Sequence, residues 1–279
     1  MRRIFVPVLL LALCLSGVLS ADSLVFDRGL PTANLNNAAG GDRSNVAWAF
    51  GNPSGSPPSN YFVGDDFSFG TVGQTYQITD LRVWIVGTGT TPLSDIFNTL
   101  TLMGGLESPA TPTTGSINDI STVDTSGDPN VNIQLATYAD GETYQGTYGS
   151  SIDMWQVDFT NLNWTVQGGT LYAFFVGATP GTDYFGDGPF LSASNAALSG
   201  SPQQGADNLM WYLGQDASTG AINDIGQWDS NGGGWDKSSD VNVELFATPE
   251  PSSILFLGTI LSIVAFLARR EYRKRQAGV

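Results

Sequence analysis

Short runs in which apolar and β-branched residues alternate with polar ones recur along the middle of the chain. In residues 81–86, Leu81, Val83 and Ile85 share one face of an extended strand, and Arg82 and Trp84 share the other. No segment between residues 22 and 247 keeps a helical apolar period over the roughly eleven residues that predict a helix. Bounded by Gly, Pro, Asn and Asp, these runs predict strands at residues 44–50, 61–69, 81–86, 97–103, 131–138, 154–159, 164–166, 170–176, 209–213 and 241–246.

Strands at this spacing in one uninterrupted span are typical of a two-sheet sandwich, so the predicted fold class is all-β. Residues 171–176 are apolar on both faces, which predicts a position at the centre of a sheet. A β-helix is the alternative architecture, but no short fixed repeat supports it.

Two segments of the predicted all-β region resemble each other. Residues 115–127 read GSINDISTVDTSG and residues 220–232 read GAINDIGQWDSNG. Each precedes a similar strand, VNIQL at 131–135 or VNVEL at 241–245. The pair represents either two related halves of a sandwich or one hairpin solution reached twice, since Asp and Gly at this spacing suit turns.

The N-terminus has the layout of a secretory signal peptide. Arg2 and Arg3 precede an apolar run over residues 4–15, and small residues follow, with cleavage expected after Ser20 or Ala21. We therefore predict a signal peptide over residues 1–21; an uncleaved anchor is the alternative. The only cysteine, Cys14, lies inside the apolar run, so the mature chain would contain no disulfide.

The C-terminus carries a second apolar segment. Residues 254–268 are uncharged and, as a helix, span about 22 Å, short of the roughly 30 Å hydrocarbon core. A basic tail over residues 269–275 follows, and its charges predict that the tail stays in the cytoplasm and that residues 22–247 lie outside. These stop-transfer charges are Arg269, Arg270, Arg273, Lys274 and Arg275.

The sequence Pro249-Glu250-Pro251, the short apolar helix and the arginine-rich end, in this order behind a signal peptide, resemble the PEP-CTERM protein-sorting signal of Gram-negative bacteria. The resemblance covers residues 248–279. It implies that an exosortase in the inner membrane recognises Pro249, Glu250 and Pro251, removes the tail and releases the protein to the cell surface or the polysaccharide matrix. Residues 271–272 and 276–279 make this tail longer and less basic than the tightest examples. An ordinary single-pass anchor is the alternative.

The region preceding this tail resembles the jelly-roll-like domains that often accompany such signals. That weaker resemblance implies a fold and no particular ligand.

Charge excludes several classes of function. The chain has 11 Lys and Arg against 26 Asp and Glu, a net charge of −15 and no histidine. A nucleic-acid partner is not expected, because phosphate neutralisation needs clustered basic residues. Histidine-dependent triads and histidine-ligated zinc or haem are excluded. Only 13% of residues are charged, about half the usual 25%, which is typical of a turn-rich extracellular β-protein.

Several aspartates are candidate calcium ligands, because Ca²⁺ binds six to eight oxygens and Asp, Ser and Asn oxygens converge in such loops. The alternative is that these residues simply form turns. Asp65 and Asp66 are a further candidate pair, with capping of a loop backbone as the alternative. The candidates in the two similar segments are Asp124 and Asp128, and in parallel Asp224, Asp229 and Asp236.

Tryptophan supplies the candidate glycan-binding residues, because flat rings stack on sugar C–H faces while Asp and Asn read hydroxyls. Trp84 is predicted to face solvent, and Trp228 and Trp235 lie in a Gly-rich stretch. The alternative is that these rings fill the core. A glycosidase needs two carboxylates about 5–9.5 Å apart, and Glu244 is the one glutamate we consider, but no pair is singled out. We therefore expect a structural or glycan-binding surface protein rather than an enzyme; a secreted Asp/Glu-dependent carbohydrate hydrolase is the alternative.

Overall fold

The computed structural model describes residues 22–31, 46–49, 59–87, 89–108, 111–136, 153–180, 189–193, 209–216, 218–228 and 240–249, together with residues 263, 264, 266, 267, 269, 270 and 273. The chain divides into two compact units, Met1–Thr248 and Pro249–Val279. The predicted signal peptide, residues 1–21, lies outside the described residues.

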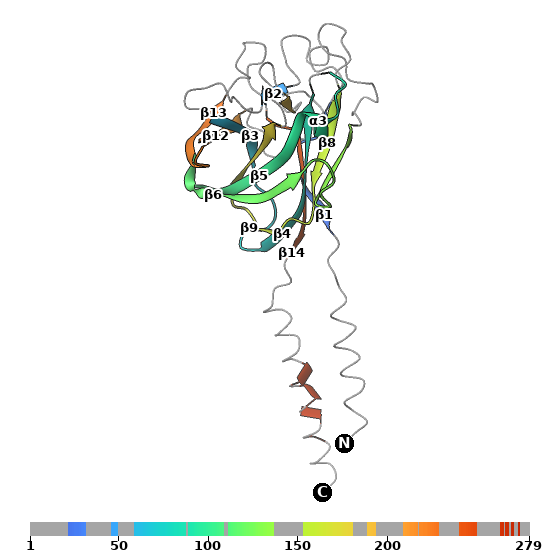
Figure 1. Cartoon of the computed structure of the whole chain (residues 1–279). Helices are drawn as coiled ribbons and strands as arrows, with labels where there is room; N and C mark the ends of the chain where they lie inside the picture. Colours follow the sequence, from blue (N-terminus) through green and yellow to red (C-terminus); the bar gives the residue numbers. More distant parts are fainter. Residues whose placement is uncertain are drawn as a thin grey trace, which may run out of the picture. The chain divides into compact units, whose positions relative to one another are not determined.

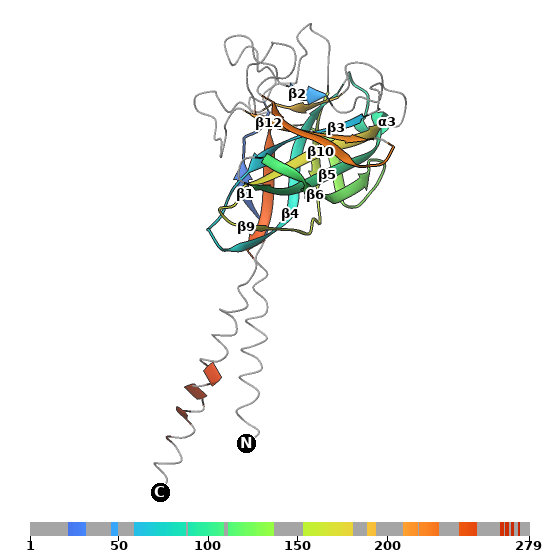
Figure 2. The same ribbon diagram turned by 90° about the vertical axis from the view of Figure 1, so that its left-hand side faces the viewer.

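The described part of the first unit is all-β, with two antiparallel sheets packed as a sandwich (Figures 1 and 2). The first sheet, here called sheet A, has the order β1 (Ser23–Asp27), β14 (Val243–Pro249), β4 (Thr75–Val86), β11 (Phe190–Ser192), β2 (Val46–Ala49). Three more strands belong to it: β8 (Met154–Phe159) and β9 (Trp164–Gln167) also pair with β4, and β7 (Val131–Leu135) pairs with β8. The second sheet, sheet B, has the order β13 (Ile222–Trp228), β12 (Met210–Asp216), β3 (Ser59–Phe67), β10 (Tyr172–Pro180), β5 (Phe97–Ser108), β6 (Thr111–Asp124). The short helix α3 (Leu93–Ile96) precedes β5.

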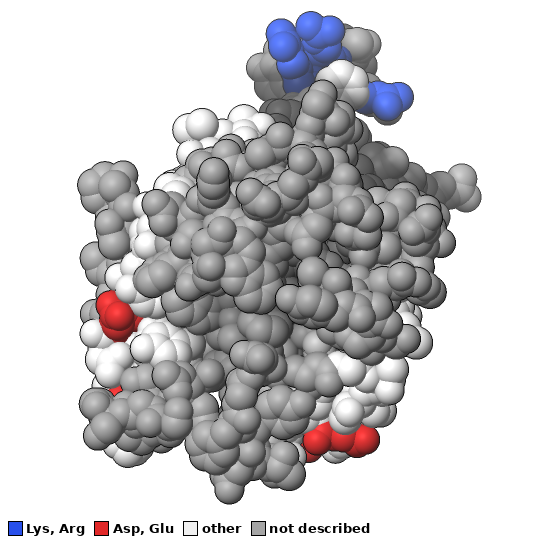
Figure 3. Space-filling model, turned by 90° about the horizontal axis from the view of Figure 1, so that it is seen from above, with Lys and Arg blue, Asp and Glu red and all other residues white. Residues whose placement is uncertain are grey.

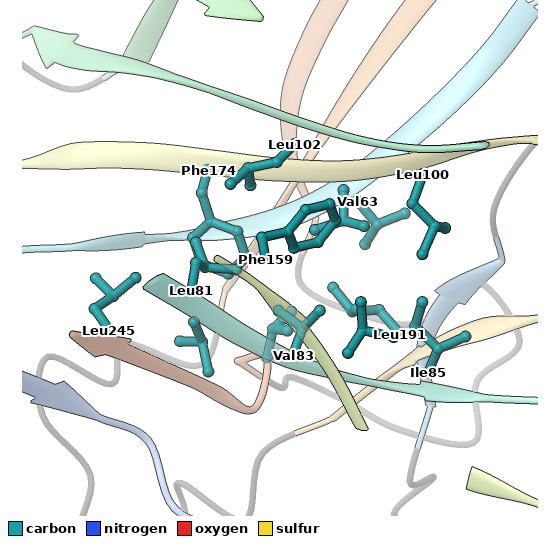
Figure 4. Close-up of a cluster of buried hydrophobic side chains, with 14 of the residues drawn as sticks. Val63, Leu81, Val83, Ile85, Leu100, Leu102, Phe159, Phe174, Leu191 and Leu245 are labelled. Carbon is teal, nitrogen blue, oxygen red and sulfur yellow. The ribbon is translucent and has the colours of Figure 1, made fainter. Parts of the chain in front are cut away.

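The main hydrophobic core lies between the sheets. Alternate residues of β4, Leu81, Val83 and Ile85, face Leu102 and Phe174 from sheet B (Figure 4). All five side chains are completely buried, and each such burial contributes about 1.5–3 kcal/mol. The prediction of a sandwich is confirmed, as is the central position of residues 171–176, because β10 lies between β3 and β5.

The sequence patterns missed four strands, namely β1, β6, β11 and β13. Residues 115–124 of the first similar segment belong to β6, and residues 222–228 of the second form β13. Each is the second strand of a hairpin in sheet B, after β5 or β12, and each precedes a strand of sheet A. The two segments therefore occupy equivalent places, at opposite edges of one sheet.

These two edges also contact each other, since β6 lies against β13. A second hydrophobic cluster lies on the face of sheet B that points away from sheet A. Ile117 of β6 belongs to it, and Ile222 and Ile225 of β13 pack against it. Its buried members are Phe62, Met103, Ile117, Ala173, Phe175, Trp211 and Leu213. Both faces of sheet B are therefore used for packing.

A buried ionic cluster joins three distant segments. The Arg28 guanidinium, which follows β1, is ion-paired with Asp65 and, at 3.2 Å, with Asp66, both on β3. Asp240, just before β14, lies 3.7 Å from the same guanidinium. Arg28, Asp65 and Asp240 are completely buried.

Backbone groups complete this cluster. Asp65 accepts hydrogen bonds from the amide N–H groups of Val241 (2.6 Å) and Asp66 (2.8 Å). Burial raises the pKa of Asp65 well above its usual range, although Arg28 opposes the shift. The sequence offered Asp65 and Asp66 as a calcium candidate or as backbone caps. In the structure, Arg28 supplies the compensating positive charge.

Replacing Arg28 by methionine is expected to lower the free energy of unfolding by about 3–5 kcal/mol, because it leaves buried carboxylates uncompensated. The matched control is Arg82→Met, at an ion pair that water can partly reach, so its loss should be smaller than that of Arg28→Met. Urea unfolding followed by tryptophan fluorescence measures both. Equal losses in the two variants would contradict a special role for the buried cluster.

Candidate functional site

Two tyrosines and an aspartate come together on β3, β12 and β13 of sheet B; we call Tyr61, Tyr212 and Asp224 the tyrosine patch. Tyr61 of β3 is opposite Gly214 of β12, and Gly214 is opposite Asp224 of β13. Tyr212 of β12 lies in the next row of residues paired across these strands. Because alternate residues share a face, all three side chains leave the sheet on the same side.

The geometry of the patch is set by glycines. The ring centroids of Tyr61 and Tyr212 are 6.5 Å apart and the rings are tilted by 60°. The Tyr212 ring lies directly over Gly226, where a Cβ atom would come within 2.6 Å of the tyrosine hydroxyl. A side chain at position 226 would therefore force the ring to move.

Electrostatics fix the protonation of the patch. Burial, followed by the negative charge of Asp224 and a hydrogen bond to it, raises the pKa of Tyr212 above its usual value of 10.0. The phenol is thus protonated at neutral pH and donates to the carboxylate. Both rings are partly exposed, and Asp224 and its neighbour Asn223 are exposed.

This combination suits a polyhydroxylated ligand. An aromatic face with its negative π cloud attracts the weakly positive C–H face of a sugar ring. The free lone pairs of Asp224 and the amide of Asn223 can accept and donate hydrogen bonds to hydroxyls. The tyrosine patch offers both kinds of contact within one exposed area of the sheet.

The prediction that Trp84 faces solvent is wrong. Trp84 is 0% exposed, and its neighbours on the same face of sheet A, Val86, Met154 and Gln156, are buried too. Alternation correctly predicts that Trp84 lies on the other face of β4 from Leu81 and Val83, but both faces of the strand are covered. Trp228 ends β13 opposite Met210, and its side chain lies outside the described part, as does Trp235.

The aspartates proposed as calcium ligands are used within the turn that follows β6. The Asp124 carboxylate accepts from the amide (2.8 Å) and hydroxyl (2.7 Å) of Ser126. The Asp128 carboxylate accepts from the amides of Asn130 (2.8 Å) and Asp124 (3.4 Å). Across the described ranges, no three acidic side chains are grouped so that they could hold a metal ion.

The other calcium candidates are also accounted for. Asp224 belongs to the tyrosine patch rather than to a loop. Asp229 and Asp236 lie outside the described residues.

A second polar group lies on the outer face of sheet A. Arg82 contacts Asp158 through Nε (2.5 Å) and Glu244 through a terminal nitrogen (2.7 Å). Gln156 and Asn132 donate further hydrogen bonds to Asp158. Burial raises the pKa of Glu244, and Arg82 opposes this shift. Glu244, the glutamate considered for hydrolysis, is thus ion-paired.

The structure describes part of the predicted sorting signal. Pro249 is the last residue of β14, while Arg269, Arg270 and Arg273 are helical and exposed. Glu250, Pro251, Lys274 and Arg275 lie outside the described residues. Within the part of the chain that is described, no helix has the length and apolar character needed to cross a membrane.

Comparison with protein-family models, with curated proteins and with solved structures found no match to this chain.

The Asp216 carboxylate, in the turn before β13, is expected to titrate near pH 2 instead of near 3.8. It accepts from the hydroxyl (2.6 Å) and amide of Ser218 and from the amide of Thr219, which stabilise the charged form. Because the folded pKa lies below the unfolded one, this stabilisation is present above about pH 4 and is lost as the pH falls through 2. Carboxyl ¹³C NMR measures the titration; an ordinary value for Asp216 would disprove the hydrogen-bonded turn.

Proposed function

We propose that this chain is an exported, non-enzymatic, jelly-roll-like protein that an exosortase releases to the bacterial surface, where the tyrosine patch binds a neutral extracellular polysaccharide. The alternative is a secreted carbohydrate hydrolase.

Charge distribution supports export and sorting. On the face drawn in Figure 3 the visible basic side chains lie near one another, whereas the visible acidic ones occur at separate places. The described arginines of the second unit, Arg269, Arg270 and Arg273, are exposed. An apolar segment followed by exposed arginines is the arrangement that a stop-transfer signal requires.

Strand connectivity supports the jelly-roll-like description. The chain repeatedly leaves one sheet for the other, as from β3 to β4 to β5 and from β10 to β11 to β12. Such crossings between facing sheets distinguish a jelly roll from a sandwich built of simple hairpins.

The observation that carries the binding function is the pair of partly exposed tyrosine rings next to Asp224, with the Tyr212 ring over Gly226. Rigid aromatic rings supply large contact area at small entropic cost. The net charge of −15 disfavours anionic polysaccharides, so a neutral glycan is the preferred ligand class.

Arg82 supports binding over hydrolysis. A glycosidase needs one carboxyl that can give up a proton and a second that attacks or activates water. Asp158 and Glu244 instead both contact the guanidinium of Arg82, so each carboxyl group already has an ion-pair partner.

Tyr212→Ala is expected to weaken binding of a neutral polysaccharide about tenfold, equal to about 1.4 kcal/mol, because it removes one of the two rings. Tyr212→Phe keeps the ring and should lose much less, and Arg82→Gln on sheet A should bind like the unchanged protein. Affinity electrophoresis in gels containing dextran or β-glucan measures all four proteins.

Two results would reject the binding proposal. One is that neither polysaccharide retards the unchanged protein; the other is equal retardation of Tyr212→Ala and the unchanged protein. Release of reducing sugar that stops in Glu244→Gln would favour the hydrolase.

The sorting proposal predicts that protein recovered from the cell surface lacks residues 1–21 and the arginine-rich tail. Intact-mass spectrometry of the native protein tests this directly. Glu250→Ala, which alters the recognition motif but no described contact, should leave the tail attached and the protein in the membrane fraction. A complete tail on surface material of the unchanged protein would overturn exosortase processing.

A further inference from the structure

The strand β7 lies at an edge of the described part of sheet A. Within the described residues β7 pairs only with β8, and it therefore forms one edge of sheet A. In the register of β7 with β8, Asn132 is opposite Asp158 and Gln134 is opposite Gln156. The Ala136 amide continues this pattern by donating to the Met154 carbonyl (2.9 Å). The backbone groups of Asn132 and Gln134 therefore point toward β8. In an antiparallel ladder the intervening residues, Ile133 and Leu135, point their N–H and C=O groups away from β8.

Three of the five side chains of β7 are exposed. Asn132, Gln134 and Leu135 are exposed, with Leu135 at 60%, while Val131 and Ile133 pack partly against the main core. A strand edge of this kind is a template for pairing with another strand.

β7 shares its neutral composition with the four-residue strands β9 and β2, but differs in composition from the other described edge strands. It contains no charged residue, glycine or proline, although the chain carries a net charge of −15. At the other edge of sheet A, β1 carries Asp27, and β2 lies against β3. The edges of sheet B, β6 and β13, carry aspartates and contact each other.

We propose that β7 pairs antiparallel with β7 of a second copy of this chain, about a two-fold axis at Ile133. This register pairs all five residues: Ile133 with its own copy, Val131 with Leu135, and Asn132 with Gln134. The Ile133 N–H donates to the Ile133 carbonyl of the other copy, and the Leu135 N–H donates to the Val131 carbonyl, each in both directions.

Self-pairing is the arrangement that a neutral strand favours. A two-fold axis places like residues close together, so a charge on β7 would meet the same charge nearby, which destabilises the pairing. Asn132 and Gln134 face each other without such a cost and can exchange amide hydrogen bonds. The pairing also continues the exposed apolar side of the strand, where Leu135 would pack beside Val131 of the other copy.

The consequence is a single sheet that runs through both copies. Two copies joined in this way would present two tyrosine patches, so under the proposed function a long polysaccharide would be held at two points, which raises avidity without new contacts. The pairing itself is independent of the proposed function and is tested without a ligand.

Leu135→Pro is the decisive variant, because it removes an outward N–H and leaves the hydrogen bonds to β8 intact. Its control, Leu135→Ala, removes the exposed side chain but retains the N–H. In sedimentation velocity of the full chain in detergent micelles, we expect dimers for the unchanged protein and Leu135→Ala, and at least a tenfold weaker association for Leu135→Pro. Equal urea midpoints for the two variants would show that both fold.

Cysteine cross-linking tests the register. With Cys14 replaced by serine, chains carrying Asn132→Cys and Gln134→Cys should form a disulfide when mixed, because these positions face each other at about 4.5 Å between Cα atoms. Each variant alone should cross-link much less. A monomer at 100 µM, a dimer unaffected by Leu135→Pro, or cross-linking to a different protein only would overturn the proposal.

Discussion

The fold depends on one buried positive charge. Arg28 lies at the end of the first strand of sheet A, yet its guanidinium reaches Asp65 and Asp66 on β3 of sheet B and Asp240 at the start of the last strand. A charge removed from water needs partners with good geometry, so the position of each of these segments is tied to the others. The cluster closes the sandwich by fixing its first and last strands to the opposite sheet.

Around this constraint, the protein packs its sheets on more faces than a simple sandwich does. The main core fills the space between the sheets, a second cluster fills the far side of sheet B, and Trp84 is buried on the far side of sheet A. Large aromatic residues therefore serve packing in several layers. The aromatic rings left partly exposed with a carboxylate beside them, Tyr61 and Tyr212, are consequently more informative about function than the tryptophans.

The two similar segments show how local chemistry and tertiary position combine. The shared Ile-Asn-Asp-Ile sequence forms the outer strand of a hairpin at each edge of sheet B, and in both copies an isoleucine is directed to the second core. In β13 the aspartate of this sequence, Asp224, contacts Tyr212. The equivalent Asp119 of β6 instead accepts from Thr122, so only one copy of the motif forms part of the patch.

The sequence alone determined the all-β class, the central strand β10 and strands such as residues 154–159, because period-two alternation records which residues pack on a sheet. It also carried the charge pattern of the two termini. Only the tertiary structure decided that Trp84 is buried and that Asp65 and Asp66 form ion pairs with Arg28. It also decided that Tyr61, Tyr212 and Asp224 lie next to one another. The physical reason is that alternation distinguishes two faces of a strand but not what covers each face. Cross-strand neighbours are set by the register between segments far apart in the sequence, such as those of Tyr61 and Asp224, 163 residues apart.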